Sequence, residues 1–174
     1  MNDHKGFFAM MARMKYIERW ALMRNSVSEN ICEHSLEVAM LAHGLGIIGR
    51  KRFGKDLSPE RLAMLGMYHD CTEIITGDMP TPVKYANDEL KEAYKAIEDS
   101  AAHRLLEMLP EDLRAEYESY FLPEQITPEE YRYVKAADKL SALIKCIEEE
   151  KTGNQEFRSA KQATYESLQQ MNMP

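Results

Sequence analysis

Clearly marked helix ends, with no strand pattern between them, are the feature that most constrains the fold of this chain. The segment SPERLAMLGMYHDCTEIITG begins with Ser58 and Pro59 and ends at Gly77. Serine caps helix starts, proline suits the first turn, and glycine often ends a helix. A later segment opens with Thr127 and Glu130 at the spacing of a capping box. Because no stretch alternates apolar and polar residues as a strand does, the sequence predicts an all-α fold.

The predicted architecture is a single helical domain over residues 1–174, with about six to eight helices. A chain of 174 residues suits one domain, and only 8 glycines and 7 prolines interrupt it. The segment DMPTPVKYAN, residues 78–87, is predicted to be a rigid non-helical loop because its two prolines resist helix formation. Helices are expected near residues 7–20, 32–49, 58–77, 88–109, 110–121, 127–151 and 154–171.

The overall charge and the cysteines narrow the choice of partner and location. A formal charge of −7 argues against a nucleic-acid polymer, since such binding needs a basic surface. A small phosphorylated substrate remains compatible, because a metal ion or a local arginine can reverse the potential inside a pocket. Three cysteines without a CxxC pair fit a reducing, cytoplasmic location. Charged residues interrupt the apolar N-terminal stretch, so we expect neither a signal peptide nor a membrane partner.

Three chemically active side chains lie close together inside the predicted helix 58–77. His69 and Asp70 are adjacent, about 100° apart around a helix axis, so both can lean towards one point. Glu73 follows three and four residues later and is therefore expected on their shared face. This face offers two possible metal ligands and one carboxylate that could handle a proton.

Two further segments supply ligands of the same kind. His34 lies at the start of one predicted helix, and Asp138 lies among apolar and small residues of another. A carboxylate in such surroundings is costly unless it is paired or bound to a metal. With His69 and Asp70 they form a set that suits Mn²⁺, Fe²⁺, Co²⁺, Ni²⁺ or Zn²⁺ better than Mg²⁺ or Ca²⁺. We therefore expect one divalent transition metal ion, which would acidify a water molecule and polarise a phosphoryl group.

The order H…HD…D resembles the signature of the HD-domain metal-dependent phosphohydrolases. The blocks RWALMRN, ENICEHSLEVAMLAH, MYHDCTEIITGDMPTPVKY and VKAADKLSALIKCIEE are similar to the corresponding blocks of the bacterial YfbR-type 5'-deoxynucleotidases. The similarity runs from Phe7 to Lys161, nearly the whole chain. It implies an HD-domain helical bundle that forms a homodimer and removes the 5'-phosphate from deoxyribonucleoside monophosphates.

The resemblance also implies a role for each matching residue. Glu73 matches the catalytic carboxylate, and Arg19 and Trp20 match an RW pair at the substrate, where Arg19 orients the phosphate. The residues that match the metal ligands are His34, His69, Asp70 and Asp138. The residues that match the nucleotide pocket are Asp78, Met79, Pro80 and Thr81. Arginine and tryptophan suit nucleotide binding, because a guanidinium can donate two parallel hydrogen bonds to a phosphate and an indole can stack on any base.

Other interpretations stay open at this stage. The same fold could hydrolyse a nucleoside triphosphate, a cyclic nucleotide or an alarmone, although a polyphosphate would call for more arginine and lysine around the pocket. A metal-containing helical binding module without catalysis is a further alternative. Taken alone, Glu73 could be a solvated helix carboxylate and Asp78 a turn cap. Arg19 could pair with Glu18, and Trp20 could belong to the core. Whether Glu73 would act as acid or base is also open.

Overall fold

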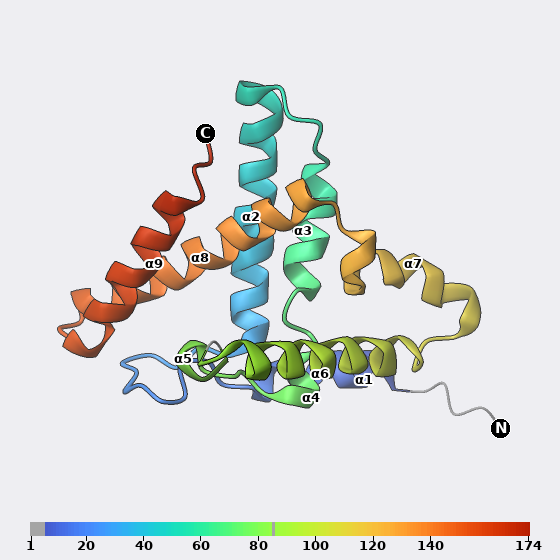
Figure 1. Ribbon diagram of the computed structural model, residues 1–174, viewed down its shortest axis with the longest axis horizontal. Coiled ribbons are helices and arrows are strands. Elements are labelled where there is room, and N and C mark those ends of the chain that lie inside the picture. The colour runs from blue at the N-terminus through green and yellow to red at the C-terminus, as the bar shows by residue number, and fades with distance from the viewer. Residues whose placement is uncertain (1–5, 85) are drawn as a thin grey trace.

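The computed structural model describes residues 6–84 and 86–174, and this part of the chain is helical and contains no strand (Figure 1). The longer helices are α2 (Ile31–Phe53), α3 (Pro59–Tyr68), α6 (Asp88–Leu106), α7 (Glu111–Phe121), α8 (Pro128–Lys151) and α9 (Arg158–Gln170). The short segments are α1 (Phe7–Met11), α4 (Glu73–Thr76), α5 (Thr81–Lys84), η1 (Ala12–Tyr16), η2 (Pro123–Gln125) and η3 (Gln155–Phe157). The predicted all-α fold is confirmed.

The helix starts read from the sequence carry the expected caps. The Ser58 side chain accepts a hydrogen bond from the backbone of Arg61 at the start of α3. Thr127 and Glu130 form the predicted capping box of α8. A second capping box, between Asn30 and Glu33, starts α2. Each cap satisfies backbone N–H groups that have no partner within the helix, so these starts are determined locally.

The helices α2, α3 and α8 form the centre of the fold. In Figure 1, α2 and α3 stand side by side, α8 crosses them, and α6 runs across their lower ends. The apolar side chains between these helices include Val38, Leu62, Leu65 and Val134, all at most 7% exposed. The helix α9 packs on α8. Residues distant in the sequence therefore meet where the lower ends of α2 and α3 approach α8.

Three local predictions are corrected by the structure. The helix expected over 7–20 ends at Met11, continues as η1, and becomes extended at Ile17. The backbone is extended there because the next residue, Glu18, pairs with Asn30 in an isolated antiparallel bridge. The helix expected over 58–77 is interrupted after Tyr68, so α3 and α4 are separate.

The third correction concerns the proline-bracketed loop. Residues 81–84 form α5, one helical turn, where a non-helical loop was predicted. Proline is tolerated in the first turn of a helix, because the N–H that it lacks has no partner there. Here Pro82 occupies such a position, and the carbonyl of Pro80 accepts hydrogen bonds from Val83 and Lys84. Residue 85 of the predicted loop lies outside the described residues.

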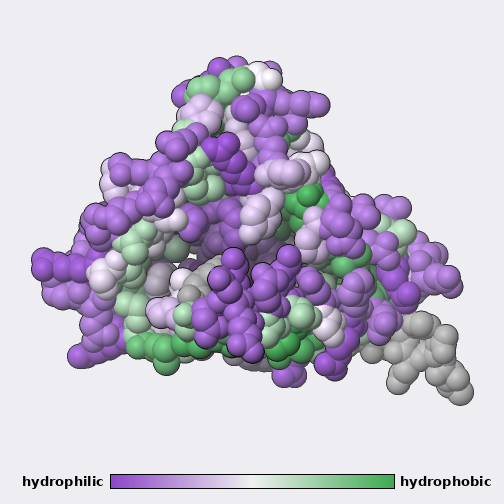
Figure 2. All heavy atoms as spheres, in the orientation of Figure 1, coloured by the Kyte–Doolittle hydropathy of each residue, from purple (hydrophilic) through white to green (hydrophobic). Residues whose placement is uncertain are grey.

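The helix α2 has the length and mean hydropathy of a membrane span, with 23 residues and a value of 1.2. A central helix of a soluble protein meets the same two criteria, and α2 lies at the centre of this fold against α3 and α8. Figure 2 shows a face dominated by hydrophilic residues, with hydrophobic ones gathered along its lower edge. Burial accounts for only part of the apolar character of α2, because Leu36 and Met40 on this helix are 56% and 61% exposed.

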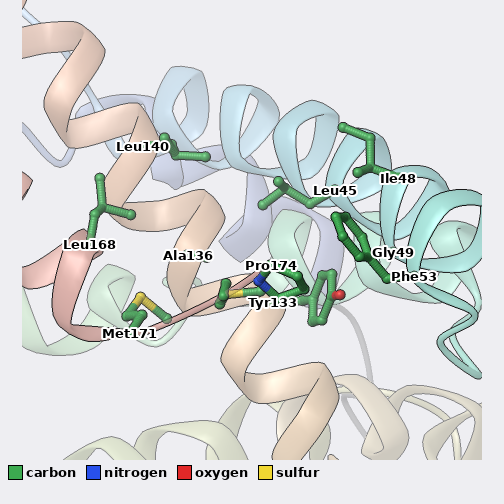
Figure 3. Close-up of a pocket in the computed structure, with 11 residues that line it drawn as sticks. Leu45, Ile48, Gly49, Phe53, Tyr133, Ala136, Leu140, Leu168, Met171 and Pro174 are labelled. Carbon is green, nitrogen blue, oxygen red and sulfur yellow. The ribbon is translucent and has the colours of Figure 1, made fainter.

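An apolar groove lies between the second half of α2, α8 and the C-terminal residues (Figure 3). Its lining includes Leu45, Phe53, Tyr133 and Leu168. At 1.5 Å per residue, these α2 residues lie about 16 Å or more along the helix from His34. The groove is therefore separate from the cluster of histidines and carboxylates described next.

Candidate metal centre and nucleotide site

His34 is placed by the first turn of α2. The Asn30–Glu33 capping box sets where the helix begins, and His34 follows directly with a fully buried side chain. Its ring lies 5.2 Å from the ring of His69, measured between centroids. The start of α2 thus places the His34 imidazole at the lower end of the helical bundle.

His69 and Asp70 lie in a turn between α3 and α4, and this corrects the predicted continuous helical face. His69 caps the C-terminal end of α3, and the backbone N–H of Cys71 donates to the carbonyl of Tyr68. The N–H of Glu73 donates to the carbonyl of Asp70, which starts the short helix α4. The two possible ligands and Glu73 are thus brought near one another by a turn.

The four predicted ligands converge on one point. The Nε2 atom of His34 lies 3.4 Å from Oδ2 of Asp70 and 3.3 Å from Oδ1 of Asp138. The Nε2 atom of His69 lies 3.1 Å from the same Asp70 oxygen and 3.9 Å from the same Asp138 oxygen. His34, His69 and Asp70 each have one possible metal-binding atom that lies within 4.8 Å of those of the other two residues. Three separate segments therefore supply one compact donor set.

Hydrogen bonds at the Nδ1 atoms of His34 and His69 indicate which ring nitrogens are protonated and which direct a lone pair towards the cluster. Nδ1 of His69 lies 2.7 Å from the carbonyl oxygen of Gly66, which can only accept, so this nitrogen carries the proton. Nδ1 of His34 lies 3.0 Å from Oγ of Ser141, whose own proton is donated to Glu37. Nδ1 of His34 is therefore also the donor. Both Nε2 atoms are left unprotonated in the neutral rings, as in metal-binding histidines.

These lone pairs make the cluster a good fit for a cation. Both Nε2 atoms are buried and lack a hydrogen-bond partner among the described residues, although carboxylate oxygens lie nearby. Lone pairs on nitrogen and on carboxylate oxygen repel one another unless a positive charge lies between them. Burial opposes charging of His34, but Asp138 and Asp70 outweigh it and raise the pKa of this imidazole. A proton and a metal ion would therefore compete for the same place.

Lys135 supports the fourth predicted ligand. Its Nζ lies 3.0 Å from Oδ2 of Asp138, one helical turn away on α8. Burial opposes the charged form of Asp138, but Lys135 and His34 outweigh it and hold the pKa of this carboxyl well below its ordinary value. The aspartate is thus ionised, with one oxygen held by lysine and the other directed at the histidines.

Glu73 is a buried carboxyl beside the cluster. Its side chain is 8% exposed, and its Oε2 has no hydrogen-bond partner among the described residues. Burial, together with the negative charges of Asp70 and Asp78, raises its pKa to about 10. A carboxyl in this environment holds a proton at neutral pH and can pass it to a nearby group.

Arg19, Trp20 and Asp78 lie near one another beside Glu73. Burial raises the pKa of Asp78, opposed by the charge of Arg19 and by a hydrogen bond from the Trp20 backbone. The Arg19 guanidinium lies over the Trp20 ring, 5.8 Å from its centroid. The same Arg19 charge acts on Glu73. The structure thus brings together the predicted phosphate, base and sugar contacts.

The other predicted pocket residues follow Asp78 along the chain. Met79 and Pro80 are half-buried, and Thr81 is exposed at the first position of α5. Their roles stay predictions, as do the ligand roles of the histidines and aspartates.

Four side chains next to this cluster were missed by sequence reasoning. Ser141 is three residues after Asp138, so the shared face of α8 could have indicated it. Lys135 lies three residues before Asp138 and could have been found in the same way. Glu37 follows His34 at the same spacing in α2. Glu29 lies in a loop before α2, where no periodicity exists to point to it.

The fold is that of the HD-domain phosphohydrolases. A solved HD-domain phosphohydrolase from Listeria innocua has the same fold, with a TM-score of 0.80, 24% identity and coverage of 95% of this chain and 81% of that one. The HD phosphohydrolase DatZ of cyanophage S-2L, solved with dA and one catalytic Zn²⁺ ion, matches with a TM-score of 0.57 and 27% identity, over 79% of this chain and 69% of that one.

Within that class the chain belongs to the 5'-deoxynucleotidase YfbR-like family, whose model matches residues 6–174. A Vibrio cholerae 5'-deoxynucleotidase is 52% identical over 155 residues, which cover 89% of this chain and 80% of that protein. The 5'-deoxynucleotidase YfbR of Shigella boydii is 47% identical over 170 residues, which cover 96% of this chain and 85% of that protein. The resemblance drawn from the motifs is thereby confirmed.

Proposed function

We propose that this protein hydrolyses deoxyribonucleoside 5'-monophosphates to deoxyribonucleosides and phosphate. The observation that carries this proposal is the meeting of three groups: the histidine–aspartate cluster, the buried Glu73, and the pair Arg19 and Trp20 beside Asp78. Relatives named 5'-deoxynucleotidase, at 47% and 52% identity over most of the chain, support the same substrate class.

The cluster suits one divalent transition metal ion. We assign the ligands as His34, His69, Asp70 and Asp138, with Mn²⁺, Co²⁺, Fe²⁺, Ni²⁺ or Zn²⁺ as candidates. The zinc in the cyanophage relative supports this class of ion. When bound, such an ion would acidify a water molecule and draw electron density from the phosphoryl group.

The substrate contacts follow from charge and shape. The fixed positive charge of Arg19 binds and orients the phosphate, because a guanidinium can donate two parallel hydrogen bonds to it. The Trp20 ring offers an apolar face to the base or the sugar. Asp78 would accept a hydrogen bond from a sugar hydroxyl and so contribute to the choice of deoxyribose. Met79, Pro80 and Thr81 would complete the wall of the nucleotide pocket.

Glu73 transfers the proton that the leaving group needs. In the reaction, a water oxygen bonds to phosphorus and the bond between phosphorus and the 5'-oxygen breaks. The leaving oxygen needs a proton, and the attacking water must lose one. A buried carboxyl with a raised pKa holds a proton that it can give to the 5'-oxygen. It then regains a proton from the attacking water, so no net charge accumulates.

Phosphate release from a panel of deoxynucleoside and ribonucleoside monophosphates tests this function. Protein stripped of metal would be reloaded with Mn²⁺, Co²⁺ or Zn²⁺ and compared with Glu73→Gln. We expect metal-dependent release from the deoxy set that the variant loses. No release from any monophosphate by metal-loaded protein would refute the proposal, and triphosphates and cyclic nucleotides would be assayed next. Ligand binding without any turnover would instead favour a binding module.

We also propose that residues 1–174 act as one cytoplasmic domain that forms a homodimer. Support for an association surface comes from α2, where Leu36, Met40 and Ile47 are 56%, 61% and 38% exposed at helical spacing. Apolar side chains aligned on one exposed helix face are typical of protein–protein contacts. Sedimentation equilibrium measures the mass directly, and a monomer at all concentrations would refute the dimer.

A further inference from the structure

Glu29 joins the two residues assigned to the substrate. One carboxylate oxygen, Oε2, accepts a hydrogen bond from the Trp20 indole at 2.8 Å and one from the Arg19 guanidinium at 3.3 Å. The side chain is only 12% exposed, so water competes weakly for these contacts. The backbone reinforces them, because the N–H of Arg19 donates to the carbonyl of Glu29 at 2.9 Å. A single carboxylate therefore sets the guanidinium and the indole relative to each other.

The backbone of Trp20 needs such support. Its φ of 59° lies in the left-handed region, which residues other than glycine, asparagine and aspartate rarely adopt. Such a conformation persists only where the surrounding structure holds it, and it is common at ligand sites. The restraints on Trp20 include its indole bond to Glu29, its ring contact with Phe157, and the hydrogen bonds that its carbonyl accepts from Met23 and Asn25.

Glu29 also faces the proposed metal centre. Its second oxygen, Oε1, lies 3.9 Å from Nδ1 of His34, too far for a hydrogen bond but close enough for a charge to act. A negative charge there favours the proton on Nδ1, which leaves Nε2 free towards Asp70 and Asp138. The same charge offsets part of the positive charge of Arg19, which would otherwise repel a nearby cation.

We propose that Glu29 is a positioning residue that holds Arg19 and Trp20 in the geometry needed to bind the phosphate and base together. This inference rests on the function proposed above. Without the carboxylate, the indole and the guanidinium would lose their shared partner, and fewer contacts would hold the strained backbone at Trp20. Because Glu29 acts on substrate contacts, its loss should raise KM more than it lowers kcat.

Glu29→Gln tests the inference, with Glu18→Gln as the matched control. Both variants remove one negative charge from the same pair of segments, but Glu18 has an exposed side chain. Trp20 is the single tryptophan of the chain, so tryptophan fluorescence reports on it alone, with or without activity. Circular dichroism checks that each variant folds, and metal content is measured after loading. If Glu29→Gln fails to fold, Glu29→Asp, which is shorter by one methylene, takes its place.

For Glu29→Gln we expect a larger acrylamide quenching constant for Trp20 than in the wild type and in Glu18→Gln. We also expect kcat/KM to fall at least about tenfold, mainly through KM, with metal content unchanged. Unchanged quenching and KM in a folded variant would overturn the inference. Changed quenching with normal kinetics would overturn the role in substrate binding. If wild-type protein hydrolyses no monophosphate, the proposed function fails, while the quenching comparison still decides whether Glu29 holds Trp20.

Discussion

Gly66 of α3 offers a sharp test of how the helices position the metal centre. A Cβ atom at this position would lie 3.0 Å from both the Cα and the backbone nitrogen of Ala39 on α2. Backbone atoms cannot turn aside as a flexible side chain can, so Gly66→Ala must push α3 away from α2. The carbonyl of Gly66 also accepts the hydrogen bond from His69, so this movement displaces a predicted ligand.

The expected cost is the difference between two opposing effects. Alanine in place of glycine in a helix interior gains about 1 kcal/mol in helix propensity. Overpacking in a well-packed contact costs about 1–3 kcal/mol, and a clash with backbone belongs at the upper end of that range. The net loss in the free energy of unfolding is therefore about 2 kcal/mol. For a domain of this size that corresponds to a fall in Tm of about 4–8 °C.

Gly44→Ala is the matched control, because the same Cβ built at Gly44 meets no atom within 4 Å. Only the propensity gain then applies, and Tm should rise by about 1–4 °C. Thermal unfolding followed by circular dichroism measures both variants, and titration with Co²⁺ measures metal affinity, which should fall in Gly66→Ala alone. A Tm of Gly66→Ala equal to or above that of Gly44→Ala would refute the packing argument.

Two further predictions concern buried carboxyl groups. Glu149→Ala should lower the free energy of unfolding by about 3–5 kcal/mol, because it leaves Lys145, 6% exposed, without its buried partner. Urea unfolding measures this, and the exposed Glu148→Gln should stay within about 0.5 kcal/mol of wild type; equal effects would contradict the reasoning. In metal-free protein, folded Glu73 keeps a proton that the unfolded chain loses above its ordinary pKa of 4.5. Stability should therefore fall as pH rises towards about 10, by up to about 1.4 kcal/mol per pH unit. Glu73→Gln should remove this slope and be more stable at pH 8, and a slope shared by both proteins would argue against a buried neutral Glu73.

Part of the site could be read from residue type and spacing. His34, His69, Asp70 and Asp138 stood out because imidazoles and carboxylates in apolar helical segments call for a partner. Their convergence was an expectation until the packing of α2, α3 and α8 placed them within reach of one another.

The errors fall where contacts between distant residues override local preference. The expected helical face of His69, Asp70 and Glu73 is broken by a turn, which spacing alone could not reveal. The helix expected through Trp20 stops at Tyr16, and the next residues form an extended segment that pairs with residues before α2. In both places the local pattern was helical, and the tertiary structure decided otherwise.

The sequence by itself determined the helical class, the helix starts and the chemical types available for a site, because caps and side-chain chemistry act over a few residues. Only the tertiary structure decided which nitrogens of His34 and His69 face the cluster, and that Glu29 holds Arg19 and Trp20 together. Those features depend on hydrogen bonds between segments that meet only when the helices pack. The physical reason is range: capping is a local interaction, whereas a binding site is assembled from distant parts of the chain.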